Sequence, residues 1–177
     1  LKLWEPRESN GAWAYSMADV ENLISKNTQL VVVNFPHNPT GFSPNLEEYK
    51  MLIDICRNND VYVFSDEMYR FLDHTPGPSL PSMSDLYEKS ISLWGTSKTF
   101  GLAGLRIGWL TSKDKTVLQR VENFKDYLSI CSSAPSEILA TIALNNLDYF
   151  LKRNLNKIQQ NIVLFSKFQS KFTNLLD

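Results

Sequence analysis

The chain has 177 residues, of which 43% are hydrophobic and 21% charged, so it is long and apolar enough to bury a core as one globular unit. Its formal net charge is -1, and its lysines and arginines are dispersed, which argues against binding to nucleic acid or to anionic membranes. It contains neither an apolar run of bilayer length nor a charged-then-apolar leader, and we therefore expect a soluble, cytoplasmic protein.

The few cysteines and histidines argue against a disulfide framework and against a bound metal. Cys56 falls within a helical pattern and Cys131 lies far from it, so we expect two buried free thiols. His37 and His74 lack the spacing of metal ligands, and we predict structural roles for both and no metal site. The chain starts without methionine and stops inside an amphipathic pattern, as expected for a piece of a longer protein.

The first 34 residues predict one helix and one strand. Residues 1–15 show no clear period and are assigned as irregular or as a strand remnant. Ser16 and Asp19 have the spacing of a capping box, which predicts a helix up to about Lys26. The β-branched run at 29–34 is typical of a strand buried in a parallel sheet.

A proline-rich loop and a second helix–strand pair follow. Residues 35–45 contain three prolines, which lock φ and predict a loop of fixed shape. Ser43 as cap and Pro44 as first helical residue would begin the next helix. The apolar run at 61–66 predicts a buried strand that ends at Asp66.

The rest of the chain predicts a loop, two strands and a helical tail. The proline-rich segment 74–81 is expected to lie on the surface. Residues 91–94 and 105–112 read as strands, and 113–130 as an amphipathic helix. From about residue 135 the pattern is wholly helical.

Alternating strands and helices predict an α/β fold, a three-layer α/β/α arrangement with a mostly parallel sheet and helices on both faces. In such sheets ligands bind outside the carboxyl ends of the strands. Several polar residues follow predicted strand ends and are expected to meet in one crevice: Asn38, Asp66, Tyr69, Lys98 and Arg106.

These five residue types suit one cofactor. A partly desolvated lysine near a second cation becomes a nucleophile toward carbonyl carbons, and an arginine fork matches a phosphate. A carboxylate at a strand end can pair with a pyridinium nitrogen, and Asn38 and Tyr69 can donate hydrogen bonds to a phenolic oxygen. Together they predict a site for pyridoxal 5'-phosphate.

Each residue taken alone has an ordinary structural explanation. Asp66 could cap a helix or form a turn, and Asn38 could shape a turn. Tyr69 could be a half-buried core aromatic, Arg106 could form a surface ion pair, and Lys98 could be a solvated surface charge. Only the combination of all five favours a functional site.

Three motifs carry a family resemblance: NFPHNPTG, SDEMYR and GTSKTFGLAGLRIGW. In order and spacing they resemble the signature segments of class I/II aminotransferases, which are fold type I pyridoxal-phosphate enzymes. The resemblance implies that residues 1–134 are part of the cofactor-binding large domain and that 135–177 are helices leading into a truncated small domain. It also implies that the N-terminal half of the large domain and most of the small domain are absent.

The resemblance implies roles for single residues. Lys98 would be the catalytic Schiff-base lysine, and Asp66 would pair with the pyridinium. Tyr69 and Asn38 would contact the phenolic oxygen, Arg106 would bind the phosphate, and the Asn38–Pro39 bond would be cis.

The sequence departs from the family pattern at the phosphate. Many members have a serine three residues before the lysine, where this chain has Gly95. Thr96 or Ser97 would then replace it, and Ser97 is the hydroxyl assigned to the phosphate.

The implied activity is transamination of an amino acid to a 2-oxo acid. A lyase or synthase using the same cofactor, or a non-catalytic ligand sensor of this fold, remains as an alternative. The resemblance also implies a homodimer of the full-length protein.

Overall fold

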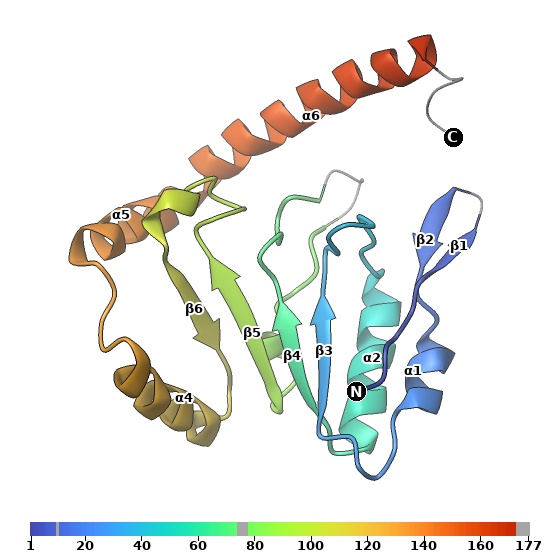
Figure 1. Ribbon diagram of the computed structural model, residues 1–177, viewed down its shortest axis with the longest axis vertical. Helices are drawn as coiled ribbons and strands as arrows, with labels where there is room; N and C mark the ends of the chain where they lie inside the picture. Colours follow the sequence, from blue (N-terminus) through green and yellow to red (C-terminus); the bar gives the residue numbers. More distant parts are fainter. Residues whose placement is uncertain (10, 74–77, 173–177) are drawn as a thin grey trace.

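The computed structural model describes residues 1–9, 11–73 and 78–172. Over these residues it contains a small hairpin and a four-stranded sheet, with helices that follow the strands (Figure 1). The strands are β1 (Arg7–Ser9), β2 (Ala12–Ala14), β3 (Leu30–Asn34), β4 (Tyr62–Asp66), β5 (Ser90–Gly95) and β6 (Gly108–Thr111). The helices are α1 (Met17–Leu23), α2 (Leu46–Asn58), α3 (Met83–Leu86), the 3₁₀ helix η1 (Ala103–Leu105), α4 (Lys115–Leu128), α5 (Ala134–Asn145) and α6 (Leu147–Lys171).

The main sheet has the strand order β3-β4-β5-β6. Strands β3, β4 and β5 are parallel, so their carboxyl ends share one edge of the sheet, whereas β6 runs antiparallel to β5. Helix α2 lies between β3 and β4 in the chain, and α3 lies between β4 and β5, as expected for crossover connections. The α/β class with a mostly parallel sheet, predicted from the sequence, is therefore confirmed.

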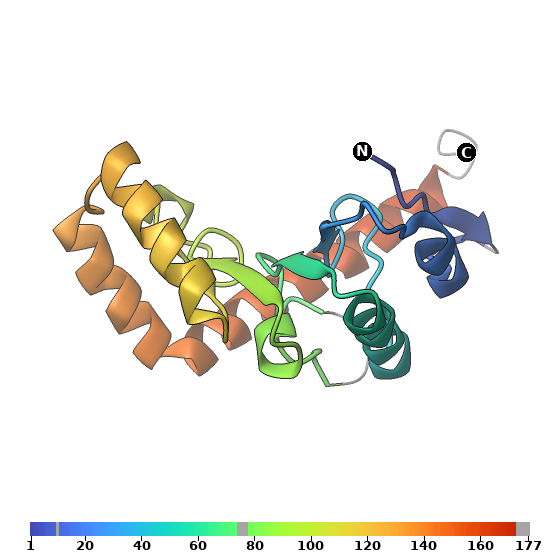
Figure 2. The same ribbon diagram turned by 90° about the horizontal axis from the view of Figure 1, so that it is seen from below.

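The two faces of the sheet differ in burial. Because strand side chains alternate, Val33 and Val63 point to the face that carries α2, where they pack with the fully buried Leu52. Figure 2 shows α2 and α3 on this side of the sheet. Leu30 and Val32, in alternate positions of β3, are 49% and 64% exposed, so the helices described here leave the opposite face of β3 open.

One predicted helix start and one predicted capping box differ from the structure. Helix α2 is capped by Asn45 and not by Ser43, because the Asn45 side chain accepts from the Glu48 N–H and the Glu48 carboxylate accepts from the Asn45 N–H. Ser16 is the N-cap of α1 but makes no side-chain capping bond. The carboxylate of Asp19, which was to complete that box, binds Arg7 in β1 at 2.7 Å instead.

Other boundaries shift by a few residues. The N-terminal segment assigned as irregular or a strand remnant contains the β1–β2 hairpin. The strand predicted from residue 105 begins at Gly108, because the preceding residues form η1. The helix predicted over 113–130 is α4, whose N-cap Asp114 accepts from the N–H groups of Thr116 and Val117.

Other predictions concern the loop at 74–81, the thiols and the tail. His74 and the rest of 74–77 lie outside the described residues. Cys56 is buried as expected, and its burial raises the pKa of its thiol to about 11. Cys131, which was also expected to be buried, is exposed.

The helical tail divides into α5 and α6 at Asn146. The domain division at residue 134 stays a prediction. None of the described helices has the length and apolar character needed to cross a membrane.

Candidate active site

The loop between β5 and β6, residues 96–107, is closed by hydrogen bonds at its base. The Thr96 N–H donates to Ile107 O at 3.0 Å, and the Leu102 N–H donates to Thr96 O at 2.9 Å. Thr96 is fully buried, and its hydroxyl lies 3.3 Å from Leu102 O and 3.2 Å from Ile107 O. Lys98 and Arg106 therefore both lie on one loop whose two ends are joined by hydrogen bonds.

A close backbone approach below this loop requires glycine at position 108. Gly95 pairs with Gly108 in the β5–β6 ladder, and a Cβ added to Gly108 would lie 2.8 Å from Trp94 O. Because that atom is backbone, we expect Gly108→Ala to lower the free energy of unfolding by about 1–3 kcal/mol. Denaturant unfolding measures this cost, with Gly104→Ala as control because its Cβ would meet nothing within 4 Å. Equal stability of the two variants would contradict the expected clash.

Asn38 and Lys98, from two separate loops, both contact Tyr69 of a third loop. The Nζ of Lys98 lies 5.5 Å from the centroid of the Tyr69 ring, within the range of a cation–π contact. The Asn38 side-chain amide donates to the Tyr69 hydroxyl at 3.1 Å. The Asn38–Pro39 peptide bond is cis, as is Phe35–Pro36. The loops after β3, β4 and β5 therefore bring Asn38, Tyr69 and Lys98 together at the carboxyl edge of the sheet.

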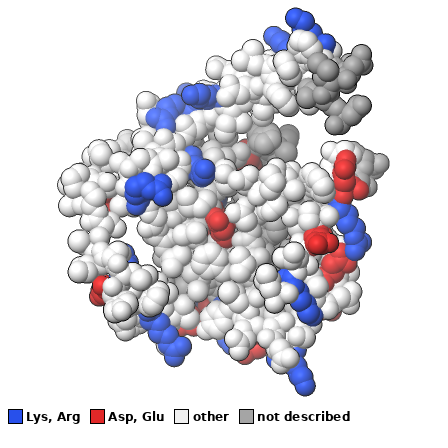
Figure 3. Space-filling model, viewed as in Figure 1, with Lys and Arg blue, Asp and Glu red and all other residues white. Residues whose placement is uncertain are grey.

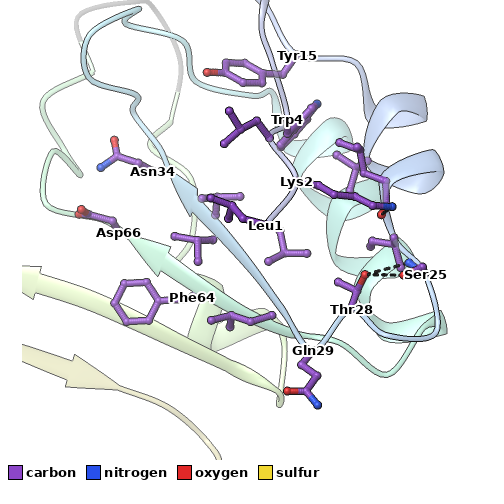
Figure 4. A pocket seen from close by; sticks show the side chains of 18 of the residues that line it. Leu1, Lys2, Trp4, Tyr15, Ser25, Thr28, Gln29, Asn34, Phe64 and Asp66 are labelled. Carbon is purple, nitrogen blue, oxygen red and sulfur yellow. Dashed lines mark hydrogen bonds between the residues drawn. The ribbon is translucent and has the colours of Figure 1, made fainter.

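Asp66 lies at the carboxyl end of β4, on the open face of the sheet. It pairs in register with Asn34 of β3 and Leu93 of β5, and its carboxylate accepts from the Met68 N–H at 3.0 Å. Figure 4 shows the side chains of Asp66 and Asn34 at one end of a groove along β3. The groove has a volume of about 800 Å³ and is mainly apolar; Lys98 and Tyr69 are not part of its lining.

Arg106 and Ser97 are on the same loop as Lys98 but are not tied to the other site residues. Arg106 is exposed, has a left-handed backbone with φ of 55°, and donates from its guanidinium to Ala103 O at 3.0 Å. Ser97 is half-buried. Of the two predicted replacements for a phosphate-binding serine, Thr96 has its hydroxyl at the base of the loop. The phosphate contact of Ser97 stays a prediction.

Sequence reasoning missed a buried acidic group next to the site. Glu67 is 3% exposed, its carboxylate accepts from Ser82, Ser92 and the Met83 N–H, and it pairs with Arg70 at 3.2 Å. Strand alternation carried a signal for it, because position 67 continues the inward series that begins at Val63.

The Glu67 pair stabilises the turn that carries Tyr69. The Arg70 guanidinium lies over the rings of Phe71 and Trp94, at 4.7 Å from each centroid. Burial, followed by the charge of Glu67, holds the pKa of the nearby Tyr49 above its ordinary value, so that hydroxyl stays protonated. The turn that carries Tyr69 is therefore held in place by buried polar contacts.

Charge is unevenly distributed on the face that carries the groove. Figure 3 shows basic side chains gathered at the upper left, next to α6, and an isolated acidic patch near the middle of the face.

Comparison with known proteins gives a consistent result. Residues 5–171 match the family described as aminotransferase class I and II. The chain is 32% identical over 161 residues to capreomycidine synthase from Streptomyces vinaceus, covering 91% of this chain and 41% of that protein. It is 31% identical over 144 residues to aspartate aminotransferase from Sulfolobus acidocaldarius, covering 80% of this chain and 35% of that protein.

A solved structure agrees with this match. A PLP-dependent aminotransferase from Streptococcus suis superposes with a TM-score of 0.86 at 28% identity, covering 96% of this chain and 44% of that one. The chain therefore spans less than half the length of each of these relatives.

Proposed function

The chain belongs to the class I and II aminotransferase family, and from this we propose that it forms the cofactor-binding part of an enzyme that transfers an amino group from an amino acid to a 2-oxo acid. The observation that carries the proposal is the contact of Lys98 and Asn38 with Tyr69 at the strand edge where β4 ends in Asp66. These are the residue types that a pyridoxal-phosphate site needs.

The residues present fit pyridoxal 5'-phosphate group by group. The Lys98 amine suits its aldehyde, the Asp66 carboxylate suits its ring nitrogen, and the Tyr69 hydroxyl with the Asn38 amide suits its phenolic oxygen. Arg106 and Ser97 suit its phosphate, and both are accessible on the lysine loop. When bound, the cofactor supplies a ring that withdraws electrons from the substrate's α-carbon.

The chain's own residues would then act in two ways. Lys98 would hold the cofactor through its amine, and the same Nζ would accept the α-proton of the substrate. The Lys98 Nζ lies 5.5 Å from the centroid of the Tyr69 ring, and this contact would keep the amine at the site. Asp66 would favour the protonated form of the ring nitrogen through its negative charge.

A second candidate function follows from one of the comparisons. Capreomycidine synthase, at 32% identity, is similar to this chain over almost as much of its length as the family match. A lyase or synthase would use the same residues around the same cofactor. The two candidates differ in what happens at the substrate beyond the α-carbon.

The experiment uses the full-length protein, saturated with pyridoxal 5'-phosphate and mixed with a panel of amino acids. A transaminase forms about one equivalent of 2-oxo acid per site and stops until a second 2-oxo acid is added. A lyase continues without that acceptor and releases a fragment of the side chain. A protein that binds the cofactor and converts none of the panel would favour the sensor, and a protein without a visible cofactor band would contradict the proposal.

The predicted homodimer and cytoplasmic location stay predictions. Sedimentation of the full-length protein at two concentrations tests the dimer, since a monomer mass at both would contradict it.

A further inference from the structure

Helix α6 contacts the lysine loop through two adjacent side chains, Arg153 and Asn154. The Arg153 Nη2 donates to Phe100 O at 2.8 Å, and the Asn154 Nδ2 donates to Thr99 O at 2.8 Å. The Arg153 Nε donates to the Asn154 Oδ1 at 3.0 Å. Because Nε–H can only donate, it fixes the oxygen of the Asn154 amide toward itself and the nitrogen toward Thr99. We call this pair and its two carbonyls the α6 clamp.

The loop is shaped to admit the clamp. Gly101 has φ of +66°, and a Cβ added there would lie 3.1 Å from the Arg153 Nη2 and 3.4 Å from the Asn154 Nδ2. Phe100 is 2% exposed and packs edge-on against Phe150 of α6, with 5.8 Å between ring centroids. The helix therefore approaches the loop closely enough for backbone carbonyls to be bound directly.

The other side of the same loop is bound to the turn that carries Tyr69. The Thr99 hydroxyl donates to Arg70 O at 2.7 Å and lies 3.3 Å from Met68 O, and Thr99 is 4% exposed. The residue next to Lys98 thus has its hydroxyl bound to the Tyr69 turn and its carbonyl bound to α6. Among the described residues, the Asn154 amide is the one side-chain donor to the Thr99 carbonyl, so a displacement of α6 alters this hydrogen bond.

We propose that Arg153 and Asn154 are positioning residues that hold the Lys98 loop through the carbonyls of Thr99 and Phe100, so that the placement of α6 sets the placement of the Lys98 amine. This inference rests on the proposed function, in which the Lys98 amine binds the cofactor, and adds which residues hold that amine in place. The contacts themselves are independent of any cofactor.

Three variants distinguish the hydrogen bonds of the α6 clamp from the positive charge of its arginine. Asn154→Asp keeps the size of the side chain but replaces the donor to Thr99 O with a carboxylate oxygen. Arg153→Lys keeps the charge but loses the fork that binds two acceptors at once. Lys157→Met is the control, because it removes a cation from an exposed position one turn further along α6.

Two measurements on the full-length protein without added cofactor test the proposal. Amide hydrogen exchange at Gly101 and Leu102 reports opening of the loop, since these N–H groups bind Lys98 O and Thr96 O. The rate of Lys98 acetylation against pH reports the surroundings of the amine.

In Asn154→Asp we expect amide exchange to accelerate about fivefold or more, because a lost hydrogen bond of about 1 kcal/mol corresponds to that factor. We also expect the pH profile of Lys98 acetylation to shift. Arg153→Lys should show the same changes, and Lys157→Met should match the wild type.

Exchange rates equal to wild type in both clamp variants would overturn the proposal. Faster exchange with an unchanged acetylation profile would also overturn it, because the clamp would then support the loop without placing the amine. If Asn154→Asp does not fold, Arg153→Lys decides by the same criteria. Absence of a visible cofactor band in the wild type would refute the proposed function. The comparison of exchange and acetylation rates between the clamp variants and the wild type would still test the positioning role.

Discussion

Lys98→Ala should abolish the visible band that the full-length protein forms with pyridoxal 5'-phosphate and lower amino-group transfer by at least about 10³-fold. The proposed site has one amine in contact with Tyr69, and alanine can neither hold the cofactor covalently nor accept the α-proton. Absorbance during titration with the cofactor, followed by the amino-acid half-reaction, measures both effects.

The loss should come from chemistry and not from unfolding. Lys98 is exposed, and the loop bonds around it are made by the backbone and by neighbouring side chains, so Lys98→Ala should unfold at the wild-type denaturant concentration. The control is Lys115→Ala, which removes an exposed lysine at the start of α4 and should leave the band unchanged. A band that survives Lys98→Ala would show that another residue holds the cofactor.

Asp66→Asn has the second largest expected effect. Asparagine keeps an oxygen that can accept from the Met68 N–H, so the turn after β4 is preserved, but the negative charge is lost. Removing one member of a hydrogen-bonded charge pair costs about 2–5 kcal/mol, or about 30-fold to several thousand-fold. We expect a decrease in this range for the half-reaction rate, measured by stopped-flow absorbance at saturating cofactor.

The matched control for this change is Asp126→Asn, on the exposed helix α4. It also removes one carboxylate charge, but from a helix that carries none of the proposed site residues. It should therefore leave the half-reaction rate at the wild-type value. A rate for Asp66→Asn within twofold of the control would exclude Asp66 as the partner of the ring nitrogen.

Strands β3, β4 and β5 were predictable from the sequence because each is a short apolar or β-branched run. The segments at 29–34 and 61–66 appear as β3 and β4, shortened by one residue at their starts. Since parallel strands place their carboxyl ends at one edge, the neighbourhood of Asn38, Tyr69 and Lys98 followed from chain order. The roles of these residues stay proposals that the variants above test.

The helix starts were less predictable, because several residues compete to cap. Asn45 with Glu48 satisfies two N–H groups reciprocally, which a Ser43–Pro44 start does not. At Ser16 the expected partner Asp19 is engaged by Arg7, from a strand that no periodicity revealed. A contact between distant segments thus decided a feature that local sequence rules treat as local.

The α6 clamp could not have been found from the sequence. Arg153 lies 53 residues from Phe100, and Asn154 lies 55 residues from Thr99. Both belong to an amphipathic helix whose pattern shows which face is apolar, but not which loop the polar side chains bind. Glu67 differs, since alternation along β4 would have placed it on the helix-covered face with Val63 and Ser65.

The most direct test of the account is to reduce the full-length protein with borohydride in the presence of pyridoxal 5'-phosphate and to map the modified peptide by mass spectrometry. Borohydride reduces a hydrolysable carbon–nitrogen double bond to a stable single bond, so the modified peptide shows which amine holds the cofactor. We predict about one cofactor per chain, attached to Lys98. Attachment to any other lysine, or no attachment at saturating cofactor, would contradict it.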